Sequence, residues 1–479
     1  MPSIHPVPAT LADADVAFRS EFPEFAATAP LDALRSREYA RLDRDGTVFL
    51  DYTAGGLYAD SQIREHGELL RAGIFGNPHS SNPASMATTH WVEKTRAAIL
   101  AFFSASPDEY VVCFTQNASG ALRLVGEAYP FERGSRYLLT FDNHNSVNGI
   151  REFARARGAA VTYAPVLPPD MRIDATRLGT FLDEADPARS NLLAYPAQSN
   201  FSGVCHSLDW IERAHERGWD VLLDAAAFVP TNRLDLGRWH PDFVPVSFYK
   251  IFGYPTGVGA LIARRSAVAK LHRPWFAGGT ITVASVRGDR FYLVDGPEAF
   301  EDGTLDYLSL PAIDIGLRHV SAVGLDLVHT RVRSLAAWLL RALAGLRHAN
   351  GLPIVHVYGP LDATDRGGTI ALNLYDASGR FVDHRLVELR AGEAGISLRT
   401  GCFCNPGGGE VALGLSASEL RSCFVRAPDR LAIDEFRRCI DDKSTGAVRV
   451  SLGIVSNFAD VHRFVEFVRG FADRTSAEL

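Results

Sequence analysis

The feature of this sequence that most constrains its fold is the alternation of short apolar runs with amphipathic stretches between residues 110 and 264. Apolar runs at 111–115, 137–141, 161–166 and 191–196 are each followed by a stretch with apolar residues at helical spacing. Helices are therefore expected at about 118–128, 146–157, 175–184 and 208–217. Strands that alternate with such helices are typical of a parallel sheet covered by helices, and strands that are apolar throughout indicate burial on both faces. The sequence therefore predicts an α/β fold whose large domain contains a mostly parallel, helix-covered sheet.

The pattern changes near Pro311. Residues 311–346 have a nearly continuous helical pattern, and strands are expected after them at 353–358, 370–375 and 447–452. We predict an organisation in three parts: an N-terminal segment over residues 1–48 that packs with the small domain, a large domain over residues 49–310, and a linking helix with a small α+β domain over residues 311–479.

Composition and charge exclude several classes of protein. The chain has 479 residues, of which 47% are hydrophobic and 22% charged, so it can bury a large core. A net charge of -7 without a long basic run argues against nucleic-acid binding. The sequence also lacks an apolar stretch of about eighteen residues, which argues against a membrane-spanning helix. Because the N-terminus does not have the pattern of a signal peptide, we expect a cytoplasmic protein.

Polar residues follow five of the predicted strands of the large domain. In open parallel sheets, ligands bind beyond the carboxyl ends of the strands, so these residues are candidates for one site. Each one alone also has a structural explanation, as a helix cap or as a turn residue that bonds to the backbone. The candidates, in chain order, are Asn117 and Ser119, His144, Asn200, Asp224 and Lys250.

Lys250 is the least easily explained of these residues. It lies between two strongly apolar strands, in a turn rich in aromatic residues and glycine. A buried lysine has a lowered pKa, and its amine can act as a nucleophile. The set fits a pyridoxal phosphate site, which needs a lysine, an acid for the pyridine nitrogen, and a helix N-terminus for the phosphate.

Four longer motifs make this interpretation specific. Together they resemble the N-terminal domain of the molybdenum cofactor sulfurases, which belong to the class V, fold-type I pyridoxal-phosphate enzymes together with the cysteine desulfurases. The resemblance runs in order over roughly residues 48 to 470, and a chance match of four such motifs in one order is improbable. The motifs are AYPAQSNFSG (194–203), VLLDAAAFVPTNRLDL (221–236), DFVPVSFYKIFGYPTGVGALI (242–262) and RTGCFCNPGG (399–408).

The resemblance implies a role for each matching residue around the cofactor. Lys250 matches the Schiff-base lysine and Asp224 the partner of the pyridine nitrogen. His144 matches the ring that stacks on the cofactor and takes part in catalysis, and Asn200 the group near the phenolic oxygen. The phosphate would be held by Ser119 and Ser247, with Asn117 beside them.

The resemblance also implies the substrate-binding and sulfur-accepting groups. Arg449 matches the arginine that binds the substrate carboxylate, for which a planar guanidinium is well suited. Cys404 matches the cysteine that accepts sulfur, and its Gly/Pro-rich loop is expected to move. Gly279 and Thr280 match a segment that completes the phosphate site of the other subunit, so we expect a homodimer.

Two departures from the family pattern limit this comparison. Many desulfurases have histidine directly before the lysine and glutamine three residues after the aspartate, whereas this chain has Tyr249 and Ala227. Tyr249 agrees with the sulfurase pattern. In addition, the chain resembles only the desulfurase half of the full-length eukaryotic sulfurases, so transfer of sulfur to the molybdenum cofactor would need a separate partner.

The six cysteines do not suggest a disulfide framework in so long a chain. Cys402 and Cys404 form a C-x-C pair without an obvious complementary Cys/His pair, so we expect no metal site. The other four are expected to be structural thiols: Cys113, Cys205, Cys423 and Cys439.

The sequence thus predicts a pyridoxal-phosphate-dependent cysteine desulfurase that converts L-cysteine to L-alanine and leaves a persulfide on Cys404. The sequence does not identify the sulfur acceptor, and the molybdenum cofactor is one candidate. An alternative is another class V reaction that does not use Cys404, such as that of an aminotransferase, a carbon–sulfur lyase or a kynureninase-like hydrolase. A non-catalytic scaffold is a further alternative, which the buried lysine and aspartate argue against.

Overall fold

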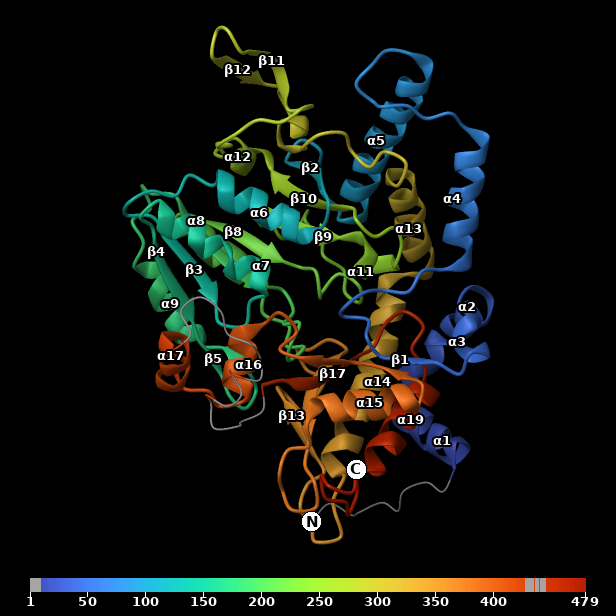
Figure 1. Ribbon diagram of the computed structural model, residues 1–479. Coiled ribbons are helices and arrows are strands. Elements are labelled where there is room, and N and C mark those ends of the chain that lie inside the picture. Colours follow the sequence, from blue (N-terminus) through green and yellow to red (C-terminus); the bar gives the residue numbers. More distant parts are fainter. Residues whose placement is uncertain (1–9, 427–434, 436–438, 440–444) are drawn as a thin grey trace.

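The computed structural model describes residues 10–426, 435, 439 and 445–479, and residues 1–9 of the predicted N-terminal segment lie outside the described residues. Figure 1 shows a large α/β part, in blue to yellow, above a smaller part in orange and red. Two consecutive helices, α13 (Leu310–Val323) and α14 (Leu325–Gly345), run from the first part into the second.

The large part is built on a seven-stranded sheet with the order β2-β10-β9-β8-β7-β3-β4. Neighbouring strands are parallel except at β10, which is antiparallel to both β2 and β9. The predicted α/β fold with a mostly parallel sheet is therefore confirmed. The strands are β2 (Tyr110–Thr115), β3 (Arg136–Thr140), β4 (Ala160–Ala164), β7 (Asn191–Pro196), β8 (Trp219–Asp224), β9 (Phe243–Ser247) and β10 (Gly259–Arg264).

Helices cover both faces of this sheet. Leu193 and Tyr195 of β7 lie in one apolar core, whereas Leu192 and Ala194 lie in the other. This alternation explains why the strands are apolar throughout. The first core contains α5 (Pro83–Phe102), α9 (Ala175–Asp183), α10 (Trp210–His215) and α13, and the second contains α6 (Ala118–Ala128) and α8 (Ile150–Ala156).

Two helices expected as continuous are interrupted at glycines. The helix expected at 146–157 is split at Gly149 into α7 (Asn145–Asn148) and α8. The linking helix is split at Gly324, whose φ of 87° is in the left-handed region that glycine adopts readily. The sequence pattern did not indicate α4 (Asp60–Ala72), α5, or the projecting hairpin of β11 (Ile281–Ser285) and β12 (Arg290–Leu293) at the top of Figure 1.

Short elements connect the main ones in the large part. They are β5 (Val166–Leu167), β6 (Arg172–Ile173), α11 (Phe248–Phe252), α12 (Arg265–Val268) and the 3₁₀ helix η2 (Pro297–Phe300). Of these, α11 is the most important for the site, because it begins directly after β9 and carries Lys250.

The smaller part contains an antiparallel sheet with the order β13-β14-β17-β16. The three strands predicted here lie within two residues of β13 (Val355–Tyr358), β14 (Thr369–Leu374) and β17 (Ala447–Ser451), and the short β16 (Arg399–Gly401) was not predicted. A separate pair joins β1 (Val48–Phe49) in parallel to β15 (Ile396–Ser397). The helices are α15 (His384–Glu393), α16 (Pro406–Ala412), α17 (Ala417–Arg426) and α19 (Phe458–Arg469).

The N-terminal helices pack against this smaller part. Phe18 of α1 (Leu11–Glu21) stacks on Phe458 of α19, with 4.6 Å between ring centroids. Arg35 of α2 (Pro30–Glu38) forms a buried ion pair with Asp460 of the same helix α19. The remaining N-terminal elements are η1 (Pro23–Thr28) and α3 (Arg41–Arg44).

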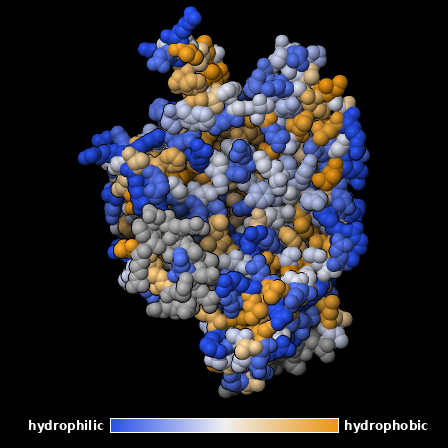
Figure 2. Space-filling model, in the orientation of Figure 1, coloured by the Kyte–Doolittle hydropathy of each residue, from blue (hydrophilic) through white to orange (hydrophobic). Residues whose placement is uncertain are grey.

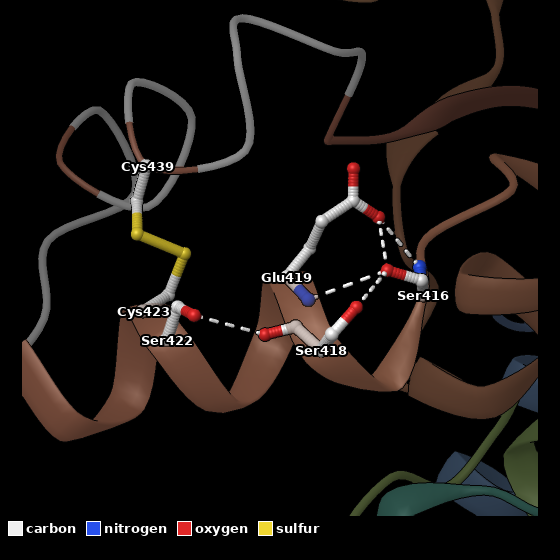
Figure 3. Close-up of a disulfide and its surroundings, with 6 residues drawn as sticks. All are labelled: Ser416, Ser418, Glu419, Ser422, Cys423 and Cys439. Atoms are coloured by element: carbon white, nitrogen blue, oxygen red, sulfur yellow. Dashed lines mark hydrogen bonds between the residues drawn. A yellow bond between two sulfur atoms is a disulfide. The ribbon is translucent and has the colours of Figure 1, made fainter.

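Cys423 of α17 and Cys439 form a disulfide (Figure 3). The expectation that the cysteines form no disulfide framework is therefore wrong for this pair, which is a disulfide and not two structural thiols. The two cysteines are 16 positions apart in sequence, and no sequence pattern indicated that they pair. No helix among the described residues combines the length and apolar character that crossing a membrane requires.

Candidate active site

The polar residues expected at the strand ends lie around one cavity. This cavity has a volume of about 180 Å³ and is located at the carboxyl edge of the large sheet. Its lining includes seven of the predicted site residues, namely Asn117, Ser119, His144, Asn200, Asp224, Ser247 and Lys250. The strand-end rule therefore identified one common site from separate segments of the chain.

Lys250 and Asp224 are carried by neighbouring strands. Lys250 lies on α11, directly after β9, and Asp224 is the last residue of β8. Burial lowers the pKa of the Lys250 amine, and the negative charge of Asp224 opposes this shift. Asp224 Oδ1 accepts a hydrogen bond from the Ala226 N–H at 3.0 Å, while Oδ2 has no hydrogen-bond partner among the described residues. The site thus offers an amine and a carboxylate oxygen to a bound molecule.

His144 begins α7 and faces the same cavity. Its Nδ1 accepts a hydrogen bond from the Ser146 N–H at 3.1 Å. Burial lowers the pKa of this imidazole, and the charges of Lys250 and Arg449 lower it further, against an opposing effect of Asp224. The ring is therefore neutral at pH 7, with its proton on Nε2. A neutral aromatic ring can stack on a flat cofactor.

The N-terminus of α6 lines the same cavity. Ser247 Oγ accepts from the Ala118 N–H at 2.9 Å, and Asn117 Oδ1 accepts from the Gly120 N–H at 2.9 Å. Ser119 Oγ is 2.6 Å from Ser146 Oγ. Hydroxyl groups at a helix N-terminus bind phosphate well. The Ser146 hydroxyl was not among the predicted residues, although its position at a helix start was a possible indication.

Arg449 of β17, in the smaller part, contacts Asn200 of the cavity lining but does not itself line the cavity. Its Nη1 donates to the Asn200 carbonyl oxygen at 3.0 Å, and its Nη2 is 3.3 Å from Asp51 Oδ1. Burial lowers the pKa of Arg449 to about 10, against the opposing charge of Asp51, so the guanidinium stays charged at neutral pH. Its buried Nε–H has no hydrogen-bond partner among the described residues.

Asp51 was missed in the sequence, which contains no indication that it contacts Arg449. It also binds Arg399 of β16, with 2.8 Å between Asp51 Oδ2 and Arg399 Nη2. Arg399 and Arg449 are direct neighbours on adjacent antiparallel strands. The Asp51 carboxylate therefore lies between two like charges and offsets their repulsion.

Cys404 is exposed, and its loop is bonded to residues of the cavity. The Cys404 carbonyl oxygen accepts from the Asn145 N–H at 2.6 Å, and the Phe403 carbonyl oxygen accepts from Asn200 Nδ2 at 2.8 Å. The Phe403 ring lies against the Arg449 guanidinium, 4.7 Å from its centroid. The loop thus contacts both the cavity and the arginine.

Thr280 and Gly279 do not reach this cavity. Thr280 is fully buried, and its hydroxyl bonds to the Ala277 N–H and carbonyl in the turn before β11. Within one chain, these two residues therefore lie outside the site formed by Lys250 and Asp224.

The residues present fit pyridoxal phosphate. Lys250 is a buried amine with a lowered pKa, and Asp224 has a free oxygen for the pyridine nitrogen. The α6 N-terminus with its hydroxyls suits the phosphate. Among the described residues, no group of three or more His, Cys, Asp or Glu side chains is placed to hold a metal ion.

Comparison with known proteins agrees with this chemistry. The family model for class V aminotransferases matches residues 48–464. This chain belongs to the class V aminotransferase family. The predicted resemblance is thereby confirmed at the level of the family.

This class V chain is similar in sequence to molybdenum cofactor sulfurases. It is 38% identical to the one from Solanum lycopersicum over 468 residues, which covers 91% of this chain and 57% of that protein. It is 39% identical to the one from Bos taurus over 466 residues, which covers 91% of this chain and 51% of that protein. The chain therefore spans about half the length of the curated relatives that it matches.

Solved structures share the fold of this class V chain. A cysteine desulfurase from Thermococcus onnurineus NA1 in its apo form has a TM-score of 0.74 at 22% identity, covering 91% of this chain and 97% of that one. C-DES with glycine covalently linked to its PLP cofactor has a TM-score of 0.68 at 17% identity. The match covers 91% of this chain and 99% of that one. C-DES, described as a cystine C–S lyase, has a TM-score of 0.66 at 17% identity in its complex with cysteine persulfide. The match covers 89% of this chain and 98% of that one. At these identities the likeness supports the fold.

Proposed function

We propose that this chain is a pyridoxal-phosphate-dependent cysteine desulfurase, which converts L-cysteine to L-alanine and keeps the sulfur as a persulfide on Cys404. One observation carries the proposal. The loop of the exposed Cys404 is hydrogen-bonded to Asn200 and Asn145, at the edge of the cavity that contains Lys250 and Asp224. The loop of an exposed thiol and a buried arginine are thus both bonded to Asn200, which lines the cavity of the buried amine. The similarity to molybdenum cofactor sulfurases supports the same reaction class.

The cofactor would be held by the residues around the cavity. Lys250 would attach it, Asp224 would hold the proton on the pyridine nitrogen, and His144 would stack on the ring. Asn200 would lie near the phenolic oxygen. The phosphate would be bound by the α6 N-terminus with Asn117, Ser119 and Ser247. When bound, pyridoxal phosphate supplies an electron sink for bonds broken at the substrate's α-carbon.

The chain's own groups then have separate tasks. Arg449 binds the carboxylate of L-cysteine through its guanidinium. Lys250 Nζ, whose lowered pKa favours the neutral amine, takes and returns the α-proton. The Cys404 thiolate attacks the sulfur of the substrate, since the thiolate is the nucleophilic form.

The transfer of sulfur balances without another reactant. A bond forms between Cys404 Sγ and the substrate sulfur while the bond between that sulfur and the substrate's β-carbon breaks. The electron pair of the broken bond stays on the β-carbon, which takes up a proton, so alanine leaves. The substrate sulfur remains on Cys404 as the outer sulfur of a persulfide, from which an acceptor takes it.

Product analysis tests this proposal. Purified protein loaded with pyridoxal phosphate and given L-cysteine and a reductant should release alanine and sulfide in equal amounts. Pyruvate with sulfide would instead establish a carbon–sulfur lyase. The description of C-DES as a cystine C–S lyase with the same fold makes this the strongest alternative. Transfer of the amino group to a keto acid would establish an aminotransferase, and no visible cofactor absorption at all would favour a scaffold.

We further propose a homodimer in which the backbone of the 279–280 segment reaches the phosphate site of the other subunit, since the Thr280 side chain is buried in its own chain. The hairpin directly after this segment projects from the chain and carries exposed apolar side chains, which Figure 2 shows as orange surface at the top. Val286 is fully exposed and Tyr292 is 62% exposed, an arrangement that favours a contact with another chain. An active monomer in sedimentation velocity at micromolar concentration would contradict this proposal.

Acceptor and location are also proposals. The names of the relatives suggest the molybdenum cofactor as sulfur acceptor, reached through a separate partner or a part outside this sequence.

A cytoplasmic location suits a thiol that must be reduced between turnovers. The Cys423–Cys439 disulfide is an observation against it. Its state in protein purified from cells without reductant, read by mass spectrometry, tests this location.

A further inference from the structure

We propose that Asn405 is a positioning residue that holds the Cys404 thiol toward the substrate site through Asn200. The inference rests on the proposed desulfurase function and adds a residue that neither the sequence motifs nor the family roles assign. Asn405 directly follows Cys404, is fully buried, and begins α16.

The side chain of Asn405 makes three hydrogen bonds. Its Oδ1 accepts from the Gly408 N–H at 2.9 Å, which caps α16. Its Nδ2 donates to the Asp142 carbonyl oxygen at 2.7 Å and to Asn200 Oδ1 at 2.9 Å. Because the Gly408 N–H can only donate and the Asp142 carbonyl can only accept, the orientation of this amide is fixed. One side chain thus joins the thiol loop to two segments of the large part.

Asn200 in turn donates a hydrogen bond back to the loop of Cys404. It accepts from Asn405 through Oδ1 and therefore directs Nδ2 to the Phe403 carbonyl oxygen, at 2.8 Å. The Asn145 N–H holds the Cys404 carbonyl oxygen at 2.6 Å. The residues on both sides of Cys404 are thereby bonded to Asn200 of the cavity lining, and the Cys404 backbone is bonded to Asn145, next to His144.

These bonds hold a backbone conformation that the loop would otherwise avoid. Phe403 and Cys404 both have a φ of 55°, in the left-handed region. For residues with a side chain, this region costs roughly 1–2 kcal/mol each, so it persists only where the surroundings impose it. When the hydrogen bonds from Asn405 and Asn200 are lost, we expect the loop to relax and the thiol to leave its position.

The loop conformation also affects the substrate arginine. The Phe403 ring lies 5.4 Å from the Phe201 ring and 4.7 Å from the Arg449 guanidinium. A thiol held next to this ring stays at a fixed distance and orientation from a carboxylate that Arg449 binds. This geometry is what attack on the substrate sulfur requires.

The variant Asn405→Asp separates positioning from helix capping. Aspartate caps a helix as well as asparagine does, so the bond from Gly408 is kept. The new carboxylate cannot donate to the Asp142 carbonyl or to Asn200 Oδ1. If Asn200 turns its amide to meet the carboxylate, its Oδ1 faces the Phe403 carbonyl, and that bond is lost instead. Asn405→Ser keeps a capping oxygen without adding a charge and serves as a second variant.

The experiment compares both variants with wild-type holoenzyme in three measurements: kinetics of alanine formation, the visible cofactor spectrum, and the alkylation rate of Cys404 by iodoacetamide, read by peptide fragmentation. We expect kcat to fall roughly 10- to 100-fold, KM for L-cysteine and the spectrum to be unchanged, and alkylation of Cys404 to become faster. Asn82→Asp is the matched control, because Asn82 caps α5 away from the cavity and should leave all three unchanged.

Two results would overturn the inference. Unchanged kcat and alkylation in both variants would mean that the bonds do not position the thiol. Loss of the cofactor spectrum, or a parallel change in KM and kcat, would give Asn405 a purely structural role. If the wild type forms no alanine, the proposed function fails, but the alkylation rates still decide whether Asn405 positions Cys404.

Discussion

Arg399 should control how tightly the substrate carboxylate binds, because it competes with Arg449 for Asp51. The Asp51 carboxylate is held by Arg399 at 2.8 Å through Nη2 and at 3.1 Å through Nε. Its contact with Arg449 Nη2 is longer, at 3.3 Å. Arg399 thus keeps an internal carboxylate partly away from the arginine that the substrate needs. In Arg399→Ala, we expect Asp51 to move closer to Arg449 and to compete with L-cysteine.

The structure sets the size of this effect. The Arg399 side chain is 51% exposed, whereas those of Asp51 and Arg449 are 13% and 3% exposed. An ion pair with one half-exposed partner is worth at most about 1 kcal/mol. That energy corresponds to a rise of about fivefold in KM for L-cysteine, with kcat unchanged because no group that contacts the reacting atoms is altered. High salt should reduce the difference, since the released charge is near solvent.

Steady-state alanine formation measures both constants, and a double variant tests the reasoning. Arg399→Ala combined with Asp51→Asn should return KM to the wild-type value or below, because the competing carboxylate is gone. Arg390→Ala is the matched control, since Arg390 is 45% exposed and pairs with Glu393 on α15. A raised KM that persists in the double variant would refute the competition and would mean that Arg399 itself binds the substrate.

Four further variants test the site and its support. Lys250→Ala should lose the visible cofactor absorption and all turnover, and borohydride reduction of the wild type should leave the pyridoxyl group on Lys250; a modified peptide with another lysine would contradict this. Since burial lowers the pKa of Lys250, reconstitution of apoprotein with pyridoxal phosphate should reach its maximal rate at a pH below 10.5. Cys404→Ala should bind cofactor and L-cysteine but release no alanine, whereas Cys402→Ala should lose much less; near-normal turnover of Cys404→Ala would favour the lyase or aminotransferase reaction. Arg35→Ala leaves the buried Asp460 carboxylate without its partner and should lower the free energy of unfolding by about 3–5 kcal/mol in a denaturant titration, and a change below about 1 kcal/mol would show that the N-terminal helices contribute little.

The large sheet could be predicted because its strands are apolar runs bounded by polar residues. The expected strand at 191–196 has the bounds of β7, and the expected helix at 118–128 has those of α6, where Asn117 provides the cap. In contrast, α5 was not predicted, although it is a long helix. Its buried face includes Thr88, Thr95 and Arg96, so hydrophobic periodicity gives little indication of it. The partners of these polar groups, such as Glu301 for Arg96, lie far away in sequence.

The candidate site was predictable where one rule places many residues at once. The carboxyl ends of neighbouring strands lie at one edge, so the sequence alone was enough to expect His144, Asp224 and Lys250 together. Asp51 follows no such rule. It meets Arg449 across 398 residues of sequence, through a bridge between Asp51 and Ser451 that joins the N-terminal part to β17.

The thiol loop shows what composition does not reveal, namely how closely the loop packs against the large part. Its glycines suggested a loop free to move, but Gly407 has another role. A Cβ atom at Gly407 would lie 1.9 Å from the Phe141 carbonyl oxygen, so glycine is needed there for α16 to approach the His144 segment closely. That close approach is what allows Asn405 to reach the Asp142 carbonyl oxygen. The same glycine that suggests flexibility in the sequence therefore allows the close packing on which the hydrogen bonds of Asn405 to the large part depend.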